Sequence, residues 1–223
     1  MRIVSLIENT SAAERLKAEH GLSLYVENCG KHYLIDTGAS DKFILNAKRM
    51  RIPLEKVEKV VISHNHFDHT GGIEALLKLN PKVKIYAKAA CIEDFYMKYG
   101  PIRIPIGQLS YLYEEHPRNT DRKSVVVSSC SHCGIVNVLK TVRMRYPDTP
   151  ILSVIGGFHL MGSSTKKLCC SVEFVDKTVN ELKGIPTGAI YTCHCTGLTG
   201  YGIMKAGLGD RLQYLQTGEE LEF

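Results

Sequence analysis

Four side chains that can bind a metal ion fall within six consecutive residues, as His64, His66, Asp68 and His69. Residues two apart on an extended backbone point the same way, so His64 and His66 can face one centre. Asp68 and His69 follow where the loop must turn, and can face another. Imidazole and carboxylate together suit zinc, iron or manganese better than calcium or magnesium. The sequence therefore predicts a divalent metal site, with zinc as the expected ion and iron or manganese as alternatives.

The cluster lies between a predicted strand and a predicted helix. Residues 57–62 are mostly β-branched and apolar, which predicts a buried strand, and residues 73–79 have the apolar spacing of a helix. Open α/β sheets bind their ligands at the carboxyl ends of such strands. A histidine-rich surface loop is the simple alternative, and both the position and the spacing of the cluster argue against it.

The sequence His-x-His-x-Asp-His at 64–69 resembles the signature of the metallo-β-lactamase superfamily of metal-dependent hydrolases. The resemblance extends over nearly the whole chain, from Ile3 to about Leu215. It implies one domain, 1–223, of the α+β or α/β class. That domain would be a four-layer αββα sandwich with the metal site at the edge between its two sheets. The predicted elements agree, because strands are followed by strand–helix units on either side of about residue 120.

The resemblance implies two sets of metal ligands, His64, His66 and His132 for the first ion, and Asp68, His69 and His194 for the second. His132 and His194 each follow a predicted strand, at 123–129 and 189–191. Asp36 stands in an Asp-Thr-Gly sequence at the end of another strand. The resemblance implies that Asp36 lies behind the metals and orients the ligand loop.

The chain departs from the superfamily pattern at the residue expected to bridge the two metals. That pattern has an aspartate after the strand 151–155, where this chain has Gly157-Phe158-His159. A neutral imidazole compensates the repulsion between two dications less than a carboxylate does, so affinity for a second metal should fall. We therefore expect one or two metal ions. His159 is expected to ligate a metal, to protonate the leaving group or to bind the substrate.

Gly-Gly-Phe-His-Leu at 156–160 and Cys-His-Cys-Thr-Gly at 193–197 resemble one branch of the superfamily. Some members of that branch are described as ribofuranosyl-aminobenzene 5'-phosphate synthases. The superfamily implies a hydrolase that uses a metal-activated hydroxide on an ester, lactone, thioester or phosphoester bond of a small molecule. Asp68 would ligate or orient that hydroxide, and Asp68 and His159 are the expected catalytic residues.

Two alternatives to a hydrolase stay open. One is a synthase-like enzyme, which needs a phosphate site, although the sequence has no P-loop. The other is a non-catalytic metal-binding or regulatory protein, which the missing bridging aspartate favours. The six other expected ligands argue against that second alternative.

Four cysteines stand on either side of His132 and His194, namely Cys130, Cys133, Cys193 and Cys195. A thiolate cluster with its own zinc, or an oxidisable pair, would require these thiols to meet. We prefer the simpler interpretation that they are small, packed loop residues, because the two histidines already serve the site.

The composition is that of an ordinary globular protein, with 44% hydrophobic and 23% charged residues among 223. The net charge of +5 comes from scattered basic residues, which argues against a nucleic-acid partner and is compatible with an anionic small-molecule substrate. No apolar stretch reaches the length of a membrane span, and the first residues lack the pattern of a secretory signal. We expect a cytoplasmic protein with reduced thiols.

The remaining predicted elements are strands at 3–6, 22–26, 32–35, 83–87, 151–155 and 212–215, and helices at 41–50, 89–99, 135–146, 171–182 and 202–206. The segment 10–21 is expected to be a short helix or an ordered loop. The irregular stretch 100–122 is expected to border the substrate pocket or to be a plain surface loop. His20, His32 and His116 are interpreted as hydrogen-bonded surface histidines.

Overall fold

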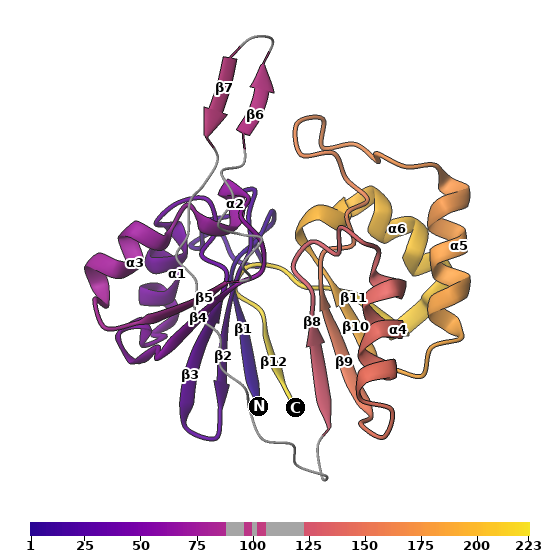
Figure 1. Ribbon diagram of the computed structural model, residues 1–223, viewed down its shortest axis with the longest axis horizontal. Coiled ribbons are helices and arrows are strands. Elements are labelled where there is room, and N and C mark those ends of the chain that lie inside the picture. The colour runs from indigo at the N-terminus through magenta and orange to yellow at the C-terminus, as the bar shows by residue number, and fades with distance from the viewer. Residues whose placement is uncertain (88–95, 100–101, 106–122) are drawn as a thin grey trace. The chain divides into compact units, whose positions relative to one another are not determined.

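The computed structural model describes residues 1–87, 96–99, 102–105 and 123–223. The chain divides into two compact units, residues 1–116 with 216–223, and residues 117–215. This boundary lies close to residue 120, where the sequence pattern also changes. Each unit has its own sheet, its own helices and its own apolar core (Figure 1). The prediction that 1–223 forms one domain stays a prediction.

The first unit is built on a mixed sheet of six strands in the order β12-β1-β2-β3-β4-β5. These strands are β1 (Arg2–Ile7), β2 (Ser23–Asn28), β3 (Lys31–Ile35), β4 (Lys59–Ile62), β5 (Lys84–Ala87) and β12 (Glu220–Glu222). β12, β1, β2 and β3 pair antiparallel, whereas β3, β4 and β5 are parallel. The carboxyl ends of β3 and β4 therefore lie at the same edge of the sheet. Asp36 and Ser63 follow those two strand ends.

The helices of the first unit are α1 (Lys42–Met50), α2 (Phe67–Thr70) and α3 (Ile73–Leu79), with a short 3₁₀ turn at Leu54–Lys56. α1 buries Phe43 and Ala47, and α3 buries Leu76, in one apolar cluster with the sheet. Gly72 stands between α2 and α3, where a Cβ would lie 2.3 Å from the carbonyl oxygen of Thr37. Only glycine allows the metal-motif loop to pack this closely on the loop after β3.

β6 (Tyr96–Tyr99) and β7 (Ile102–Pro105) form an antiparallel pair. The helix predicted over 89–99 is therefore wrong at 96–99. Tyr96 pairs with Pro105 and Tyr99 with Ile102, and aromatic residues such as these tyrosines are good strand formers. Residues 89–95 of that prediction, His116, and the stretch 100–122 apart from β7 lie outside the described residues.

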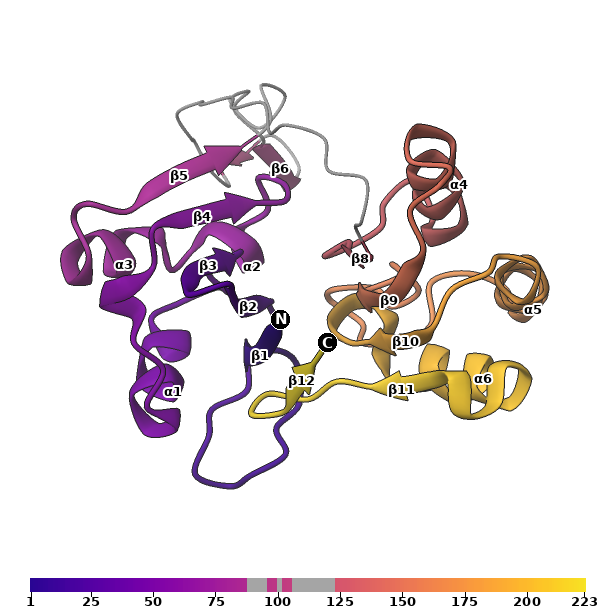
Figure 2. The ribbon, with the colours of Figure 1, turned by 90° about the horizontal axis from the view of Figure 1, so that it is seen from below.

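The second unit is built on a parallel sheet in the order β11-β10-β9-β8, made of β8 (Ser124–Val127), β9 (Ile151–Gly156), β10 (Ala189–Thr192) and β11 (Leu212–Tyr214). Its helices are α4 (Ile135–Arg145), α5 (Val172–Lys183) and α6 (Gly197–Leu208). All three helices cover the same face of this sheet (Figure 2). Because the strands are parallel, the loops after β8, β9 and β10 gather at one edge.

The helix near the end of the chain and the last strand differ from the predicted elements. α6 is longer than the helix predicted at 202–206, because the glycines at its start hid its helical pattern. The segment 10–21, all of it described, has no helix and is therefore the ordered loop that was the other expectation. β12 was not predicted, and it joins the first unit by pairing antiparallel with β1, where Glu220 also forms an ion pair with Arg2.

The helices of residues 1–87 and 123–223 are short, and none has the length and apolar character needed to cross a membrane.

Candidate metal centre

Asp36, at the end of β3, holds the metal-motif loop through its carboxylate. This side chain is fully buried. Its Oδ1 accepts a hydrogen bond from the backbone N–H of Ser63 at 2.8 Å, and its Oδ2 accepts one from the Ser63 hydroxyl at 2.7 Å. Oδ2 also lies 2.7 Å from Nδ1 of His69, which is likewise fully buried. Because a carboxylate can only accept, Nδ1 of His69 carries the proton and Nε2 holds the lone pair that a metal would bind.

Ser63 determines in a similar way which ring nitrogen of His64 carries the proton. Its hydroxyl donates its one proton to Asp36, and Oγ lies 2.8 Å from Nδ1 of His64. Oγ must therefore accept from Nδ1–H, which leaves the lone pair of His64 on Nε2. Ser63 was not among the predicted site residues, although its position directly before the motif was an available signal.

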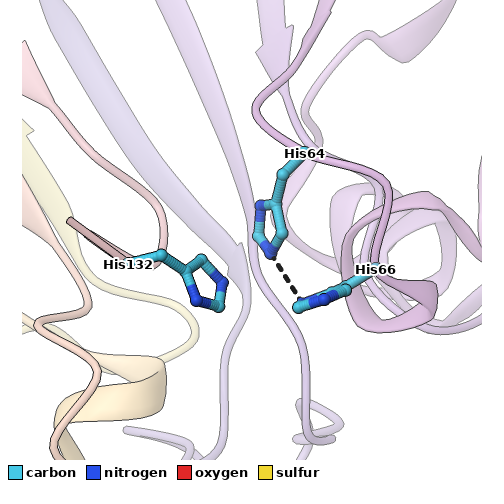
Figure 3. Close-up of side chains that lie close together, drawn as sticks. All are labelled: His64, His66 and His132. Carbon is cyan, nitrogen blue, oxygen red and sulfur yellow. Dashed lines mark hydrogen bonds between the residues drawn. The ribbon is translucent and has the colours of Figure 1, made fainter. Parts of the chain in front are cut away.

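His64 and His66 come together at the distance that a shared metal requires. Nε2 of His64 lies 3.1 Å from Nδ1 of His66, on the loop before α2 (Figure 3). Two nitrogen ligands of one tetrahedral zinc, each about 2.0–2.1 Å from the ion, are about 3.3 Å apart. The ring of His64 also lies beside His69, with ring centroids 4.2 Å apart. The donors of the first unit therefore fit a divalent metal ion.

Asp68 lies between two histidines of the first unit. Its Oδ2 is 3.6 Å from Nε2 of His69 and 3.4 Å from Nε2 of His20. The backbone N–H of Leu22 donates to the carbonyl oxygen of Asp68 at 3.2 Å, which holds this segment against the motif loop. His20 is thus a further candidate residue of the site. No sequence pattern marked His20 for this role, because it precedes a strand instead of following one.

The loops after the parallel strands of the second unit carry the remaining predicted residues. His132 follows β8 and His159 follows β9, and both are exposed, with ring centroids 4.2 Å apart. His194 follows β10 and is fully buried in a 3₁₀ turn, His194–Thr196. The second unit therefore brings His132 and His159 together. It places His194 instead beside Cys130 and Cys195.

Four residues at these strand ends have the left-handed backbone conformation that L-residues seldom adopt, namely Asp36, Ser131, His159 and His194, with φ of 57°, 43°, 55° and 48°. Such a conformation costs about 1–3 kcal/mol at each residue and persists only where the surrounding structure enforces it. Asp and His tolerate it better than most residues. Backbone strain concentrated at these loops is typical of a functional site.

Cys195 and His159 affect each other's protonation. The backbone N–H of His159 donates to Sγ of Cys195 at 3.3 Å. Hydrogen bonding with Cys130, and to a lesser extent with His159, holds the pKa of the Cys195 thiol well below its usual range, although burial opposes this. The hydrogen bond with Cys195 in turn raises the pKa of His159 against the effect of burial. A negative sulfur beside His159 therefore favours its protonated form.

Comparison with known proteins gives matches over most of the chain. The model of the metallo-beta-lactamase superfamily matches residues 16–129. A protein of Methanocaldococcus jannaschii named 7,8-dihydropterin-6-methyl-4-(beta-D-ribofuranosyl)-aminobenzene-5'-phosphate synthase is 24% identical, and the match covers 92% of this chain and 90% of that protein.

Two solved structures are similar over the whole chain. One is a metal-dependent hydrolase of the β-lactamase superfamily, with a TM-score of 0.70, 24% identity, and coverage of 100% of this chain and 99% of the other. The other is the metallo-β-lactamase fold protein YhfI from Bacillus subtilis, with a TM-score of 0.58, 16% identity and the same coverage. At these identities the likeness shows the fold, and it confirms the predicted fold class.

Proposed function

Because the chain belongs to the metallo-β-lactamase superfamily, we propose that it is a metal-dependent hydrolase that acts on an ester, lactone, thioester or phosphoester bond of a small molecule. The observation that carries this proposal is the 3.1 Å separation of Nε2 of His64 and Nδ1 of His66. The buried bond of Asp36 to His69 supports it, because it holds a third donor in one tautomer. Zinc is the proposed ion, since imidazole and carboxylate donors suit it.

The proposed ligands are those that the superfamily pattern assigns, His64, His66 and His132 for one ion, and Asp68, His69 and His194 for a second. A bound ion would supply hydroxide near neutral pH and stabilise negative charge in the transition state. Asp68 would orient the attacking water through its carboxylate. His159 would donate a proton to the leaving group or bind the substrate. The mild positive charge of the chain suits an anionic substrate, and we propose a cytoplasmic enzyme.

A synthase-like activity is the second candidate, and one observation favours it. The match to the M. jannaschii synthase covers 92% of this chain. Such an activity would form a carbon–carbon bond between the ring of an aminobenzoate and C1 of phosphoribosyl diphosphate, with diphosphate leaving from C1 and the carboxyl group leaving as carbon dioxide. An assay with aminobenzoate and phosphoribosyl diphosphate tests it directly, and no product above a metal-only background removes this candidate.

Replacement of one motif histidine tests the hydrolase proposal. We expect His66→Ala to lose metal, and to lose more than about 100-fold in kcat/KM on whichever of the four bond classes the purified protein hydrolyses. His32→Ala is the matched control, because His32 lies in the same unit but contacts Tyr25. Elemental mass spectrometry gives metal per chain, and circular dichroism confirms folding of both variants. Full metal content and full turnover in His66→Ala would contradict the proposal, and metal without turnover in the unmutated protein would favour a metal-binding protein.

A further inference from the structure

We propose that Cys130, His194 and Cys195 form a thiolate-containing metal site within the second unit. Each side chain offers one donor atom, and the three donor atoms all lie within 4.8 Å of one another. The residues are 6%, 0% and 4% exposed, respectively. The ligand sets that the superfamily pattern implies contain no cysteine, so this site adds two donors to them.

The spacing of these donors is close to that of a tetrahedral zinc site. With Zn–S near 2.3 Å and Zn–N near 2.0–2.1 Å, two sulfur ligands are about 3.8 Å apart, and a sulfur and a nitrogen about 3.6 Å apart. The donors, at most 4.8 Å apart, need to approach by about 1.2 Å at most, which we expect rotation of the cysteine side chains to provide. Two thiolates also neutralise the charge of a dication, which a buried site requires.

The fold holds Cys195 at its backbone and at its sulfur. Its carbonyl oxygen accepts hydrogen bonds from the backbone N–H groups of Leu160 at 2.9 Å and Met161 at 2.8 Å. Its Sγ accepts the N–H of His159 at 3.3 Å, and an N–H aimed at sulfur stabilises the thiolate form. A Cβ at Gly157 would lie 2.5 Å from that sulfur, so glycine at 157 leaves the space that the thiol occupies.

The turn that carries His194 is fixed just as closely. Oγ1 of Thr196 accepts the backbone N–H of Phe158 at 2.8 Å and lies 2.5 Å from Oγ1 of Thr192. These contacts tie the loop after β9 to the loop after β10. Cys130 reaches the same place from the loop after β8, and Sγ of Cys195 lies 3.7 Å from its carbonyl oxygen.

The two proposed cysteine ligands come from different loops, so the spacing of cysteines in the sequence does not reveal them. Cys133, three residues from Cys130, is exposed. Cys193 is buried, but among the described residues neither it nor Cys133 joins Cys130 in a donor group. From the sequence, all four cysteines were interpreted as packed loop residues. For Cys130 and Cys195 we propose a metal-ligand role instead.

The ligand class follows from the donors. Two thiolates and one imidazole select zinc, cadmium or cobalt over magnesium, calcium or manganese, and leave a fourth position for water or another ligand. Because His194 is also assigned to a metal in the proposed function, this inference rests on that function to that extent. The two thiolates would supply negative charge to an ion at His194. In the superfamily pattern the bridging aspartate supplies such charge, and this chain lacks that aspartate.

Zinc K-edge absorption of the full-length, reduced protein loaded with zinc tests the site without any mutation. We expect two sulfur neighbours per chain at about 2.3 Å. A coordination shell made only of nitrogen and oxygen would overturn the proposal, however much zinc is bound.

Cobalt(II) in place of zinc gives a second test on variants. The wild type should show a thiolate-to-cobalt charge-transfer band, which Cys130→Ser and Cys195→Ser should each reduce at least by half. Cys29→Ser and Cys133→Ser are controls at exposed thiols and should retain the full band. His66→Ala should also retain it, which separates this site from the ion assigned to His64, His66 and His132. An unchanged band in both Cys130→Ser and Cys195→Ser would overturn the inference.

Discussion

Nδ1 of His69 lies 2.7 Å from a carboxylate oxygen of Asp36, and both side chains are fully shielded from solvent. The two residues are far apart in sequence but meet because β3 and β4 are parallel neighbours. The same carboxylate also binds the backbone and hydroxyl of Ser63. Asp36 therefore fixes the tautomers of His69 and, through Ser63, of His64. This makes Asp36 the residue on which the arrangement of donors in the first unit depends.

Replacing Asp36 with asparagine should weaken metal binding without unfolding the chain. Asparagine tolerates the left-handed backbone that position 36 requires, where φ is 57°. Its amide cannot accept all the protons that the carboxylate accepts, so the lone pairs of His64 and His69 lose their fixed positions. We expect zinc affinity to fall about 10- to 100-fold, measured by competition with a chelating dye. Asp41→Asn is the control, since Asp41 is exposed and makes no side-chain capping bond. Equal zinc affinities of the two variants would contradict the role of Asp36.

Two glycine-to-alanine substitutions should change stability in opposite directions. At Gly72 an added Cβ would lie 2.3 Å from the Thr37 carbonyl oxygen and 2.5 Å from the Phe43 ring, so we expect a loss of about 1–3 kcal/mol. Gly202 lies inside α6, and beyond its chain neighbours and the helix's own backbone no atom lies within 4 Å of an added Cβ, so alanine there should stabilise the chain by about 0.5–1 kcal/mol. Urea denaturation of both variants measures the two changes. A urea midpoint of Gly72→Ala equal to or higher than that of Gly202→Ala would contradict the close packing of the metal-motif loop on the loop after β3.

The buried Tyr25 should make stability fall at alkaline pH. Burial, with a further contribution from Glu27, raises the pKa of Tyr25 to about 12 from a reference value of 10.0. The folded state thus holds the phenol proton more tightly than the unfolded state. The resulting stabilisation is complete below pH 10 and is lost as the pH rises toward about 12.

Tyr25→Phe removes this titration, together with the 2.5 Å hydrogen bond between the tyrosine hydroxyl and Nδ1 of His32. The wild type should be more stable than the variant below pH 10, and its advantage should shrink as the pH approaches about 12. Urea midpoints of both proteins over this range measure the difference. A difference that stays constant with pH would contradict the raised pKa.

The sequence was sufficient for the fold class because its signals are local and repeated. The apolar run that ends at Ile62, the motif at 64–69 and the helical spacing of 73–79 each indicate the same strand–loop–helix unit. Three further loops with histidine follow strands in the same way. Patterns of this kind are set by burial of one face, so they remain visible in the sequence.

The parts of the fold and of the candidate site that were not predicted depend on contacts between residues far apart in the chain. A single sequence carries no signal for such contacts. His20 reaches Asp68, and Cys195 reaches Cys130, only because sheet order brings their loops together. β12 was missed for the same reason, since its partner is β1 at the other end of the chain. At 96–99 the aromatic residues fit both a helix and a strand, and pairing with β7 decides between them.

The most direct test of a metal-dependent enzyme is the metal content of the protein purified without added metal or chelator, determined by elemental mass spectrometry. We predict at least one equivalent of zinc, iron or manganese per chain. One equivalent would agree with weakened binding of a second ion where His159 replaces the bridging aspartate. Two equivalents would agree with thiolates that compensate for the missing negative charge of that aspartate. A chain that carries no metal, and that binds none when zinc is supplied and excess is removed, would contradict the account.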